Sequence, residues 1–244
     1  MAGHSHSANI AVRKGKQDAA RAKLFSKLSR YIMIAAKNGG GDPDTNLRLR
    51  YAIDKARGVS MPKDNIERAV KKGTGDLEGE NYEEITYEGY YGPVAVLVDT
   101  LTEKRTRTNG DVRLIFDKLG GSMGTPGCVG YLFDRKGLFI VSAKKYPDED
   151  AVMTVALEAE AEDFQRDGDV YEIICDPSKF APVLDALKAA RIEPEESEVR
   201  ALAKTLTDVD VETGKKVLRL IDALEDNDDV QNVYTNAKFT ADMV

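Results

Sequence analysis

The sequence predicts an α+β multidomain protein: an N-terminal three-helix domain is followed by two ferredoxin-like α/β domains, one inserted in the other. Three observations predict this fold class. The first 75 residues combine helical hydrophobic spacing with 16 Lys and Arg against only 6 Asp and Glu. A polar, Gly-rich segment, Gly73 to Glu80, then suggests a domain boundary. Beyond it, β-rich runs alternate with amphipathic segments. The predicted domains are a basic head (residues 1–78), a split α/β domain (79–135 and 207–244) and an inserted ferredoxin-like domain (136–206).

The basic head is predicted to contain three helices. Residues 17–37 carry apolar side chains at spacings of three and four, which is typical of one amphipathic helix, and the glycines at 39–41 end it. Asp42 is the predicted N-cap of the second helix, because a proline follows it at the first helical position. Pro62 opens the third helix, which is predicted to end at Gly73.

The rest of the chain is predicted to alternate strands with helices. In chain order the predicted elements are strands 85–90 and 94–101, helix 109–119, strands 129–133 and 138–141, helix 148–162, strand 170–175, helix 178–190, strand 199–205, helix 212–226 and strand 230–235. Residues 138–205 therefore have a βαβαβ order close to a ferredoxin-like unit, with a further strand expected near residues 191–196.

Basic residues line one side of the first predicted helix. Lys16, Lys23, Lys27, Arg30 and Lys37 fall within an arc of roughly 80° beside the apolar stripe. Each Lys or Arg that neutralises a phosphate releases condensed counterions, so this arc suits a polyanion, although a merely solvated helix face would carry the same charges. We predict that the head binds nucleic acid. The candidate contact residues are Arg13, Lys14, Lys16, Lys23, Lys27, Arg30, Lys37, Arg48, Arg50, Arg57, Lys63, Arg68, Lys71 and Lys72.

The charge of the remaining chain has the opposite sign. It holds 19 basic and 36 acidic residues, which brings the whole chain to a net charge of −7. The negative charge of the body repels phosphates from the rest of the surface, so that only the head attracts them. An acidic surface also increases solubility.

Several functional classes find no support in the sequence. The only histidines, His4 and His6, precede every predicted element, so no His is held as a general base, and we predict neither catalytic residues nor an enzyme. No Cys/His spacing, Walker loop or dinucleotide fingerprint indicates a metal or cofactor. A copper or nickel site at an exposed Ala2-Gly3-His4 terminus is a minor alternative.

Other features concern location and association. No apolar run approaches the roughly 18 residues that a membrane span needs, and no signal peptide opens the chain, so we expect a cytoplasmic protein without membrane contact. Cys128 and Cys175 are expected to be free thiols, as is usual in a reducing compartment. No coiled-coil or other dimer signal is present, so we expect a monomer.

A set of short segments, spread over nearly the whole chain, is specific in combination. The segments are Met1-Ala2-Gly3-His4-Ser5, Ala8-Asn9-Ile10, the run from Ala35 to Pro43, the run from Met61 to Ile66, Tyr87-Glu88-Gly89-Tyr90, the run from Gly120 to Gly124, the run from Val129 to Phe133, Ala223-Leu224-Glu225-Asp226 and the run from Val230 to Tyr234. This set resembles the YebC family. The N-terminal arm departs from the familiar pattern, since His6-Ser7 stands where Lys-Trp is expected and Val12 where His is usual.

The resemblance implies a helical N-terminal domain followed by two α/β domains, one inserted in the other. The family is described as DNA-binding regulators of transcription, while an organellar relative activates translation and bacterial members have been assigned to the ribosome. RNA is recognised by shape, phosphate and 2′-OH contacts, whereas specific DNA binding needs donors aimed at base edges. The sequence favours general polyanion binding over base reading.

We therefore predict a non-enzymatic regulator of gene expression. It would be a translation factor that contacts ribosomal RNA on the ribosome through its basic head. The alternative is a regulator of transcription that binds duplex DNA. An enzyme acting on nucleic acid and a protein-interaction role are further alternatives.

Overall fold

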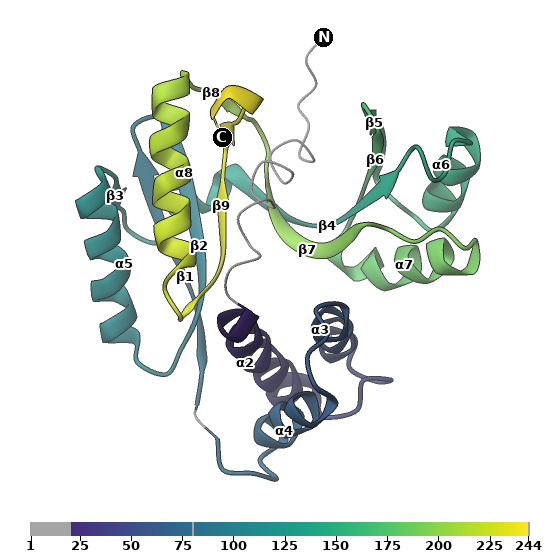
Figure 1. The fold of residues 1–244 in the computed structure, drawn as a ribbon, viewed down its shortest axis with the longest axis horizontal. Coiled ribbons are helices and arrows are strands. Elements are labelled where there is room, and N and C mark those ends of the chain that lie inside the picture. The colour runs from purple at the N-terminus through teal and green to yellow at the C-terminus, as the bar shows by residue number, and fades with distance from the viewer. Residues whose placement is uncertain (1–20, 80, 244) are drawn as a thin grey trace. The chain divides into compact units, whose positions relative to one another are not determined.

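The computed structural model describes residues 21–79 and 81–243, which fall into two compact units (Figure 1). The N-terminal unit comprises the described residues up to 128 together with Lys216–Val233, and the inserted unit comprises Val129–Lys215 together with residues 234–243. Three helices come first and mixed α/β elements follow, which confirms the predicted fold class. The finer domain boundaries at residues 78, 135 and 206 stay a prediction.

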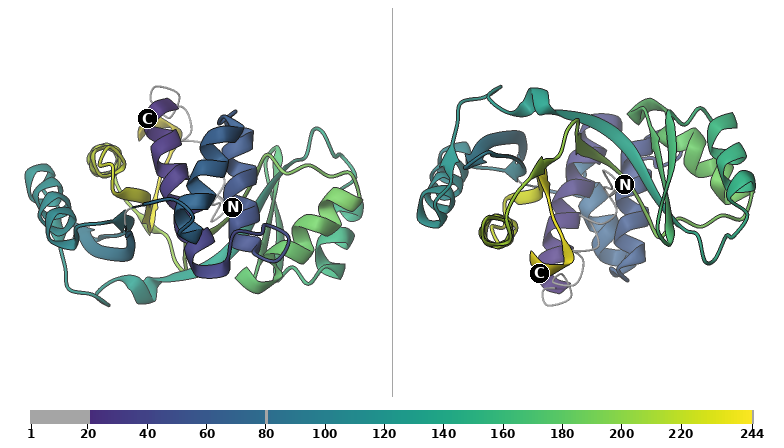
Figure 2. Two further views of the ribbon diagram at one scale, coloured as in Figure 1. Left: turned by 90° about the horizontal axis from the view of Figure 1, so that it is seen from below. Right: turned by 90° about the horizontal axis from the view of Figure 1, so that it is seen from above.

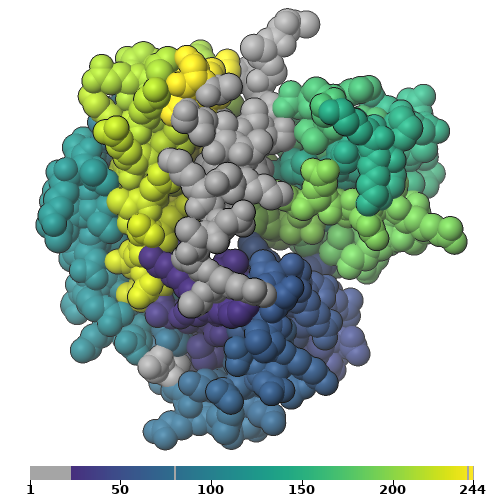
Figure 3. Space-filling model, in the orientation of Figure 1, coloured from purple at the N-terminus to yellow at the C-terminus, as the bar shows by residue number. Residues whose placement is uncertain are grey.

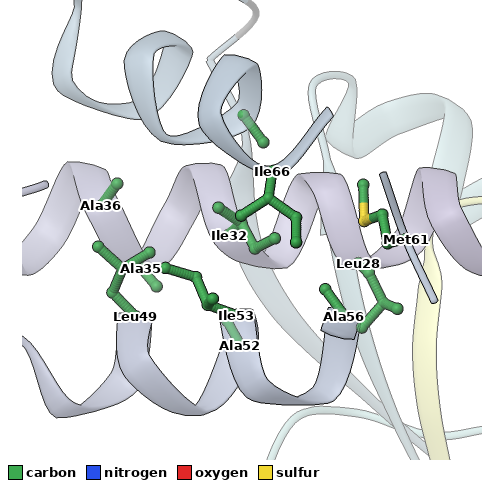
Figure 4. Close-up of a cluster of buried hydrophobic side chains, with 11 residues drawn as sticks. Leu28, Ile32, Ala35, Ala36, Leu49, Ala52, Ile53, Ala56, Met61 and Ile66 are labelled. Atoms are coloured by element: carbon green, nitrogen blue, oxygen red, sulfur yellow. The ribbon is translucent and has the colours of Figure 1, made fainter. Parts of the chain in front are cut away.

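Three helices form the described part of the basic head: α2 (Arg21–Gly39), α3 (Leu47–Gly58) and α4 (Lys63–Thr74). Each helix contributes one apolar stripe to a shared core, shown in Figure 4. Ile32 of α2, Leu49 of α3 and Ile66 of α4 all lie in this core, and the first two are fully buried. Removing such side chains from water is the main favourable contribution to folding for so small a domain.

The N-cap of α3 is Asn46, not Asp42 as predicted. The side chain of Asn46 accepts a 3.1 Å hydrogen bond from the backbone N–H of Leu49. Its amide also donates to the carbonyls of Ala35 and Gly40, both at 2.8 Å, so one buried residue caps α3 and satisfies carbonyls at the end of α2. Asp42 instead stabilises the preceding turn by accepting from the N–H of Asp44 at 2.9 Å.

Gly73 lies inside α4 and lets two helices approach closely. A Cβ at this position would lie 2.3 Å from the carbonyl oxygen of Met33 and 2.7 Å from the Cβ of Ala36, both on α2. The helix ends at Thr74, and its C-cap Gly75 has a φ of 87°, the left-handed conformation that glycine adopts at little cost. The predicted helix end at Gly73 is therefore a packing position.

The second part of the N-terminal unit is a four-stranded sheet in the order β3-β1-β2-β9. Its strands are β1 (Glu83–Tyr91), β2 (Val94–Thr102), β3 (Ser122–Met123) and β9 (Val230–Thr235), and its helices are α5 (Arg105–Leu119) and α8 (Val211–Glu225). Strands β1 and β2 form an antiparallel hairpin that turns at Gly92. Phe116 of α5 packs so closely on β1 that a Cβ at Gly89 would lie 2.7 Å from its ring.

The inserted unit has the ferredoxin-like topology that the sequence predicts. Its elements are β4 (Phe133–Ser142), α6 (Glu149–Glu158), β5 (Asp163–Asp167), β6 (Val170–Cys175), α7 (Phe180–Ala189) and β7 (Glu196–Ala203). All pairs in the sheet are antiparallel, in the order β5-β6-β4-β7. Figures 1 and 2 show α6 and α7 side by side against this sheet. The short elements are the 3₁₀ helices Gly130–Leu132, Pro177–Lys179 and Ala241–Met243 and the parallel pair β8 (Thr207–Asp208) and β10 (Ala237–Lys238).

Three predicted elements differ from the structure. Residues 133–142 form one continuous strand, although the predicted strands 129–133 and 138–141 were separated by a charged turn. Helix α6 stops at Glu158, before the predicted end at residue 162, and β5 follows at Asp163–Asp167, where no strand was predicted. No separate strand forms at residues 191–196, and the residues there lead into β7.

The head packs on the sheet of its own unit. Ile34 of α2, Tyr82 before β1 and Leu101 of β2 form a small buried cluster. The guanidinium of Arg30 lies 5.4 Å from the ring centroid of Tyr82, within the range of a cation–π contact. One side of α2 is therefore held by the sheet, which decides where the basic residues of this helix can point.

Candidate nucleic-acid interface

The basic residues of α2 face an acidic loop of the same unit. This loop, residues 225–229, joins α8 to β9 and has the sequence Glu-Asp-Asn-Asp-Asp; we call it the acidic loop. Lys23 Nζ lies 3.1 Å from Asp226 Oδ1 and also donates to the Asp226 carbonyl. Lys27 Nζ donates to the Glu225 carbonyl at 2.6 Å. Figure 3 shows the purple atoms of α2 against the yellow atoms at this end of α8 and β9.

Arg30 makes the third contact of this kind. Its guanidinium lies 3.2 Å from Asp229 Oδ1 and donates to the Asp228 carbonyl. Lys27 and Lys23 thus meet the carbonyls of Glu225 and Asp226 at the end of α8, where the helix dipole favours positive charge, and Arg30 meets a carbonyl of the loop beyond it. We call these three side chains the α2 cations.

Burial lowers the pKa of Lys27. Removal from water lowers the pKa of its ammonium group below the usual value, and the neighbouring charge of Lys23 lowers it further. The charges of Glu225, Asp228 and Asp226 act in the opposite direction and only partly offset the burial.

Asp229 fixes the acidic loop to the sheet and to α5. Its carboxylate accepts hydrogen bonds from Thr108 at 2.6 Å, Arg107 at 2.8 Å and Thr102 at 3.3 Å, and its carbonyl accepts from the N–H of Leu101 at 2.8 Å. Thr102 and Thr108 are fully buried, so these bonds satisfy polar groups that water does not reach.

The pKa of Asp229 lies below its usual value despite its burial. Burial raises it, but hydrogen bonds from Thr108 and Arg107, together with the charges of Arg107 and Arg30, lower it by more. The ionised carboxylate is consequently the form that this site stabilises. Neither Asp229 nor Arg107 was among the predicted site residues, because the acidic run from Glu225 to Asp229 has the composition of an ordinary surface turn.

The remaining α2 residue of the predicted arc is held elsewhere. Lys37 Nζ donates to the side-chain oxygen of Asn81 at 3.1 Å. Three further predicted contact residues, Arg13, Lys14 and Lys16, lie outside the described residues.

The three candidate residues of α3 are partly engaged in the fold. Arg48 pairs with Glu84 and lies 5.2 Å from the ring of Tyr31. Arg50 donates to the carbonyls of Pro43 and Asp44 at 3.0 and 3.1 Å and so braces the turn before α3. Arg57 is exposed and has only a 3.7 Å pair within its own helix, a geometry that contributes little.

The candidate residues of α4 are the most accessible. Lys63 pairs with Glu67 at 3.5 Å along the helix, and both side chains are largely exposed. Arg68, Lys71 and Lys72 are exposed, and none of the described residues forms a hydrogen bond or ion pair with their side chains. At about 100° per residue these three fall within roughly 100° of one another, opposite the buried Ile66 and Ala69. We call them the α4 cations.

Several cations of the inserted unit are paired with carboxylates. Six of them lie within 3.3 Å of a carboxylate: Lys136, Lys144, Lys145, Arg166, Lys179 and Lys204. Their charge is locally balanced by carboxylates, whereas the α4 cations carry no such partner among residues 21–79 and 81–243. The α4 cations are therefore one cluster of accessible positive charge. Arg113 and Lys118 of α5, Lys188 of α7, Arg191, and Arg219 of α8 are also exposed without an ion pair among the described residues.

The described residues contain no grouping of three His, Cys, Asp or Glu side chains that could hold a metal ion. Both cysteines are free thiols, and burial raises the pKa of Cys175 to about 11. Within the same ranges, each helix is too short or too polar to span a bilayer.

The fold and the basic surface define an α+β protein of two compact units with a cationic helical head. The chain belongs to the TACO1/YebC family, since residues 5–76 match the model of the N-terminal domain and residues 82–237 match that of the second and third domains.

Its relatives are similar over almost their whole length. A "Probable transcriptional regulatory protein" of Clostridium tetani is 50% identical over 98% of both chains. A protein of the same description from Desulforapulum autotrophicum is 51% identical over 97% of this chain and 96% of its own. A crystal structure of a conserved hypothetical protein from Aquifex aeolicus is 44% identical, with a TM-score of 0.84 over 96% of this chain and 97% of that one.

Proposed function

We propose that this protein is a non-enzymatic, nucleic-acid-binding regulator of gene expression that holds phosphate backbones on its basic head. The observation that carries the proposal is the exposure of Arg68, Lys71 and Lys72 without ionic partners among the described residues. Such side chains neutralise phosphates without giving up an existing ion pair, so their counterion release contributes fully to affinity.

We propose RNA on the ribosome as the target. The α4 cations are spread over a short helix that also carries Asp64 and Glu67, and this surface suits phosphate contacts better than a row of base-edge donors. On this proposal the protein works as a cytoplasmic monomer.

Duplex DNA is the second candidate. The relatives named above are called transcriptional regulatory proteins, and α4 offers Lys63, Asn65 and Arg68 near its N-terminus, where recognition helices meet base edges.

Two binding measurements separate the targets. The purified protein is sedimented with ribosomes at two salt concentrations, and gel shifts are run on duplex DNAs of varied sequence at the same salts. Retention on ribosomes at the higher salt, with weak and sequence-independent DNA shifts, is the expected result. A strong shift of one DNA sequence only, with no ribosome retention, would favour the transcriptional regulator. Absence of binding to either would contradict the proposed function.

A further inference from the structure

We propose that the acidic loop competes with nucleic acid for the α2 cations and so lowers the affinity of the head. The inference rests on the proposed function and adds its regulation. The loop would be an internal occupant of part of the phosphate-binding surface, and nucleic acid would have to displace it to reach Lys23, Lys27 and Arg30.

The chemistry of the contacts supports this competition. Each α2 cation meets carboxylate or carbonyl oxygens of the loop: Lys23 at Asp226, Lys27 at Glu225, and Arg30 at Asp228 and Asp229. Lys and Arg recognise carboxylate and phosphate oxygens with the same donors, so one set of cations can hold either group.

The exposure of the Lys23–Asp226 contact makes displacement of the outer part of the loop possible. The side chain of Asp226 is 84% exposed and that of Lys23 is 28% exposed, so their pair is open to water. Exposed ion pairs contribute little and are screened by salt, whereas a polyanion offers several phosphates at once. Asp229, by contrast, is only 5% exposed and stays bound to Thr108 and Arg107, so the loop remains anchored when its outer residues are released.

A purely architectural role for the loop makes the opposite prediction. If Glu225, Asp226 and Asp228 only attach the head to the sheet, neutralising them cannot strengthen binding at the α2 cations. If the loop competes with nucleic acid, a weaker contact between the loop and the α2 cations raises the affinity of the α2 cations for nucleic acid by the same factor.

The test compares two triple variants that change the net charge equally. The loop variant carries Glu225→Gln, Asp226→Asn and Asp228→Asn. The control carries Glu158→Gln, Asp117→Asn and Asp185→Asn, three exposed acids for which the structure shows no cationic partner among the described residues. Binding of a fluorescein-labelled RNA oligonucleotide of mixed sequence is measured by anisotropy on the full chains, with circular dichroism to confirm folding.

The loop variant should bind this RNA about three- to tenfold more tightly than the control, because it removes the partly exposed Lys23–Asp226 ion pair and the charges of Glu225 and Asp228 beside Lys27. An affinity equal to that of the control or weaker, with the fold intact, would overturn the proposal.

A second measurement detects the contact between Lys23 and Asp226 directly in the wild-type protein. A zero-length carbodiimide should join Lys23 to Asp226, whose charged atoms lie 3.1 Å apart, and Asp226→Asn identifies the product. Saturating RNA should suppress this cross-link. If RNA binds but the cross-link is unchanged, the competition is contradicted and the proposed function is not. If no variant binds RNA or duplex DNA, both the competition and the proposed function are contradicted.

Discussion

Thr108 and Asp229 lie 121 residues apart in the chain, and a 2.6 Å hydrogen bond joins the Thr108 hydroxyl to the Asp229 carboxylate. The bond connects α5 to the loop after α8, and Arg30 of the head meets the other oxygen of the same carboxylate. Asp229 therefore links the helical head, the sheet and α5 through one charged group.

We expect Asp229→Asn to lower the free energy of unfolding by about 2–4 kcal/mol. The substitution removes the negative charge that pairs with both Arg30 and Arg107. The NH₂ group of the new asparagine would also face side chains that are themselves hydrogen-bond donors. Urea unfolding followed by circular dichroism measures the loss. The neighbouring Asp228→Asn is a matched control on an exposed residue and should change stability by less than about 0.5 kcal/mol. Equal effects of the two substitutions would contradict a special role for Asp229.

The contribution of Asp229 should depend on pH. Because its folded pKa lies below the unfolded value of about 3.9, the stabilisation is complete above that value and is lost as the pH falls through the folded pKa. The difference in unfolding free energy between the wild type and Asp229→Asn should thus be constant from neutral pH down to about pH 5 and shrink below about pH 4. A difference that persists unchanged in strong acid would show that packing, not charge, is lost.

Gly73→Ala should destabilise the head by about 1–3 kcal/mol, because the new methyl group would overlap the Met33 carbonyl. Gly110→Ala is the control: this glycine lies in α5 with open space around its Cβ position, and alanine there should stabilise by about 0.4–1 kcal/mol. Thermal unfolding of both variants gives the comparison. A stable Gly73→Ala protein would mean that α2 and α4 can separate without cost.

The two cysteines should react at very different rates with a thiol reagent. Cys175 is fully buried and its pKa is raised to about 11, so little thiolate forms at neutral pH. Cys128 is only partly buried and should react first in the folded protein. Absorbance after addition of Ellman's reagent to the wild type and to Cys128→Ser measures this. Fast reaction of the Cys128→Ser protein without denaturant would contradict the burial of Cys175.

Much of the fold could be predicted because its signals are local. The hairpin of β1 and β2 follows from two β-rich runs around Gly92, and strand Val230–Thr235 has the predicted bounds. Strand β5, with the sequence Asp-Phe-Gln-Arg-Asp, gives no hydrophobic pattern because it lies at an edge of the sheet and depends on pairing with β6. Asn46 caps α3 because it also reaches α2, a tertiary reason that local capping rules do not contain.

The candidate site was predictable only in part. Helical spacing places Lys23, Lys27 and Arg30 on one face, but it gives no information about what that face meets. Their partners lie about 200 residues further along the chain, with separations of 203, 198 and 199 residues in the three contacts. The α4 cations could be listed from composition, but their lack of ionic partners required the structure.

The central claim, that the α4 cations hold phosphates, is tested most directly by the salt dependence of binding. The variant Arg68→Gln, Lys71→Gln, Lys72→Gln is compared with Lys144→Gln, Lys145→Gln, Lys204→Gln, which removes the same charge from ion-paired residues of the inserted unit. Glutamine keeps a good helix propensity, so α4 should persist. The slope of log K against log salt for RNA should flatten by up to about 0.7 per lost contact in the first variant only. Identical slopes and affinities in the two folded variants would contradict the claim.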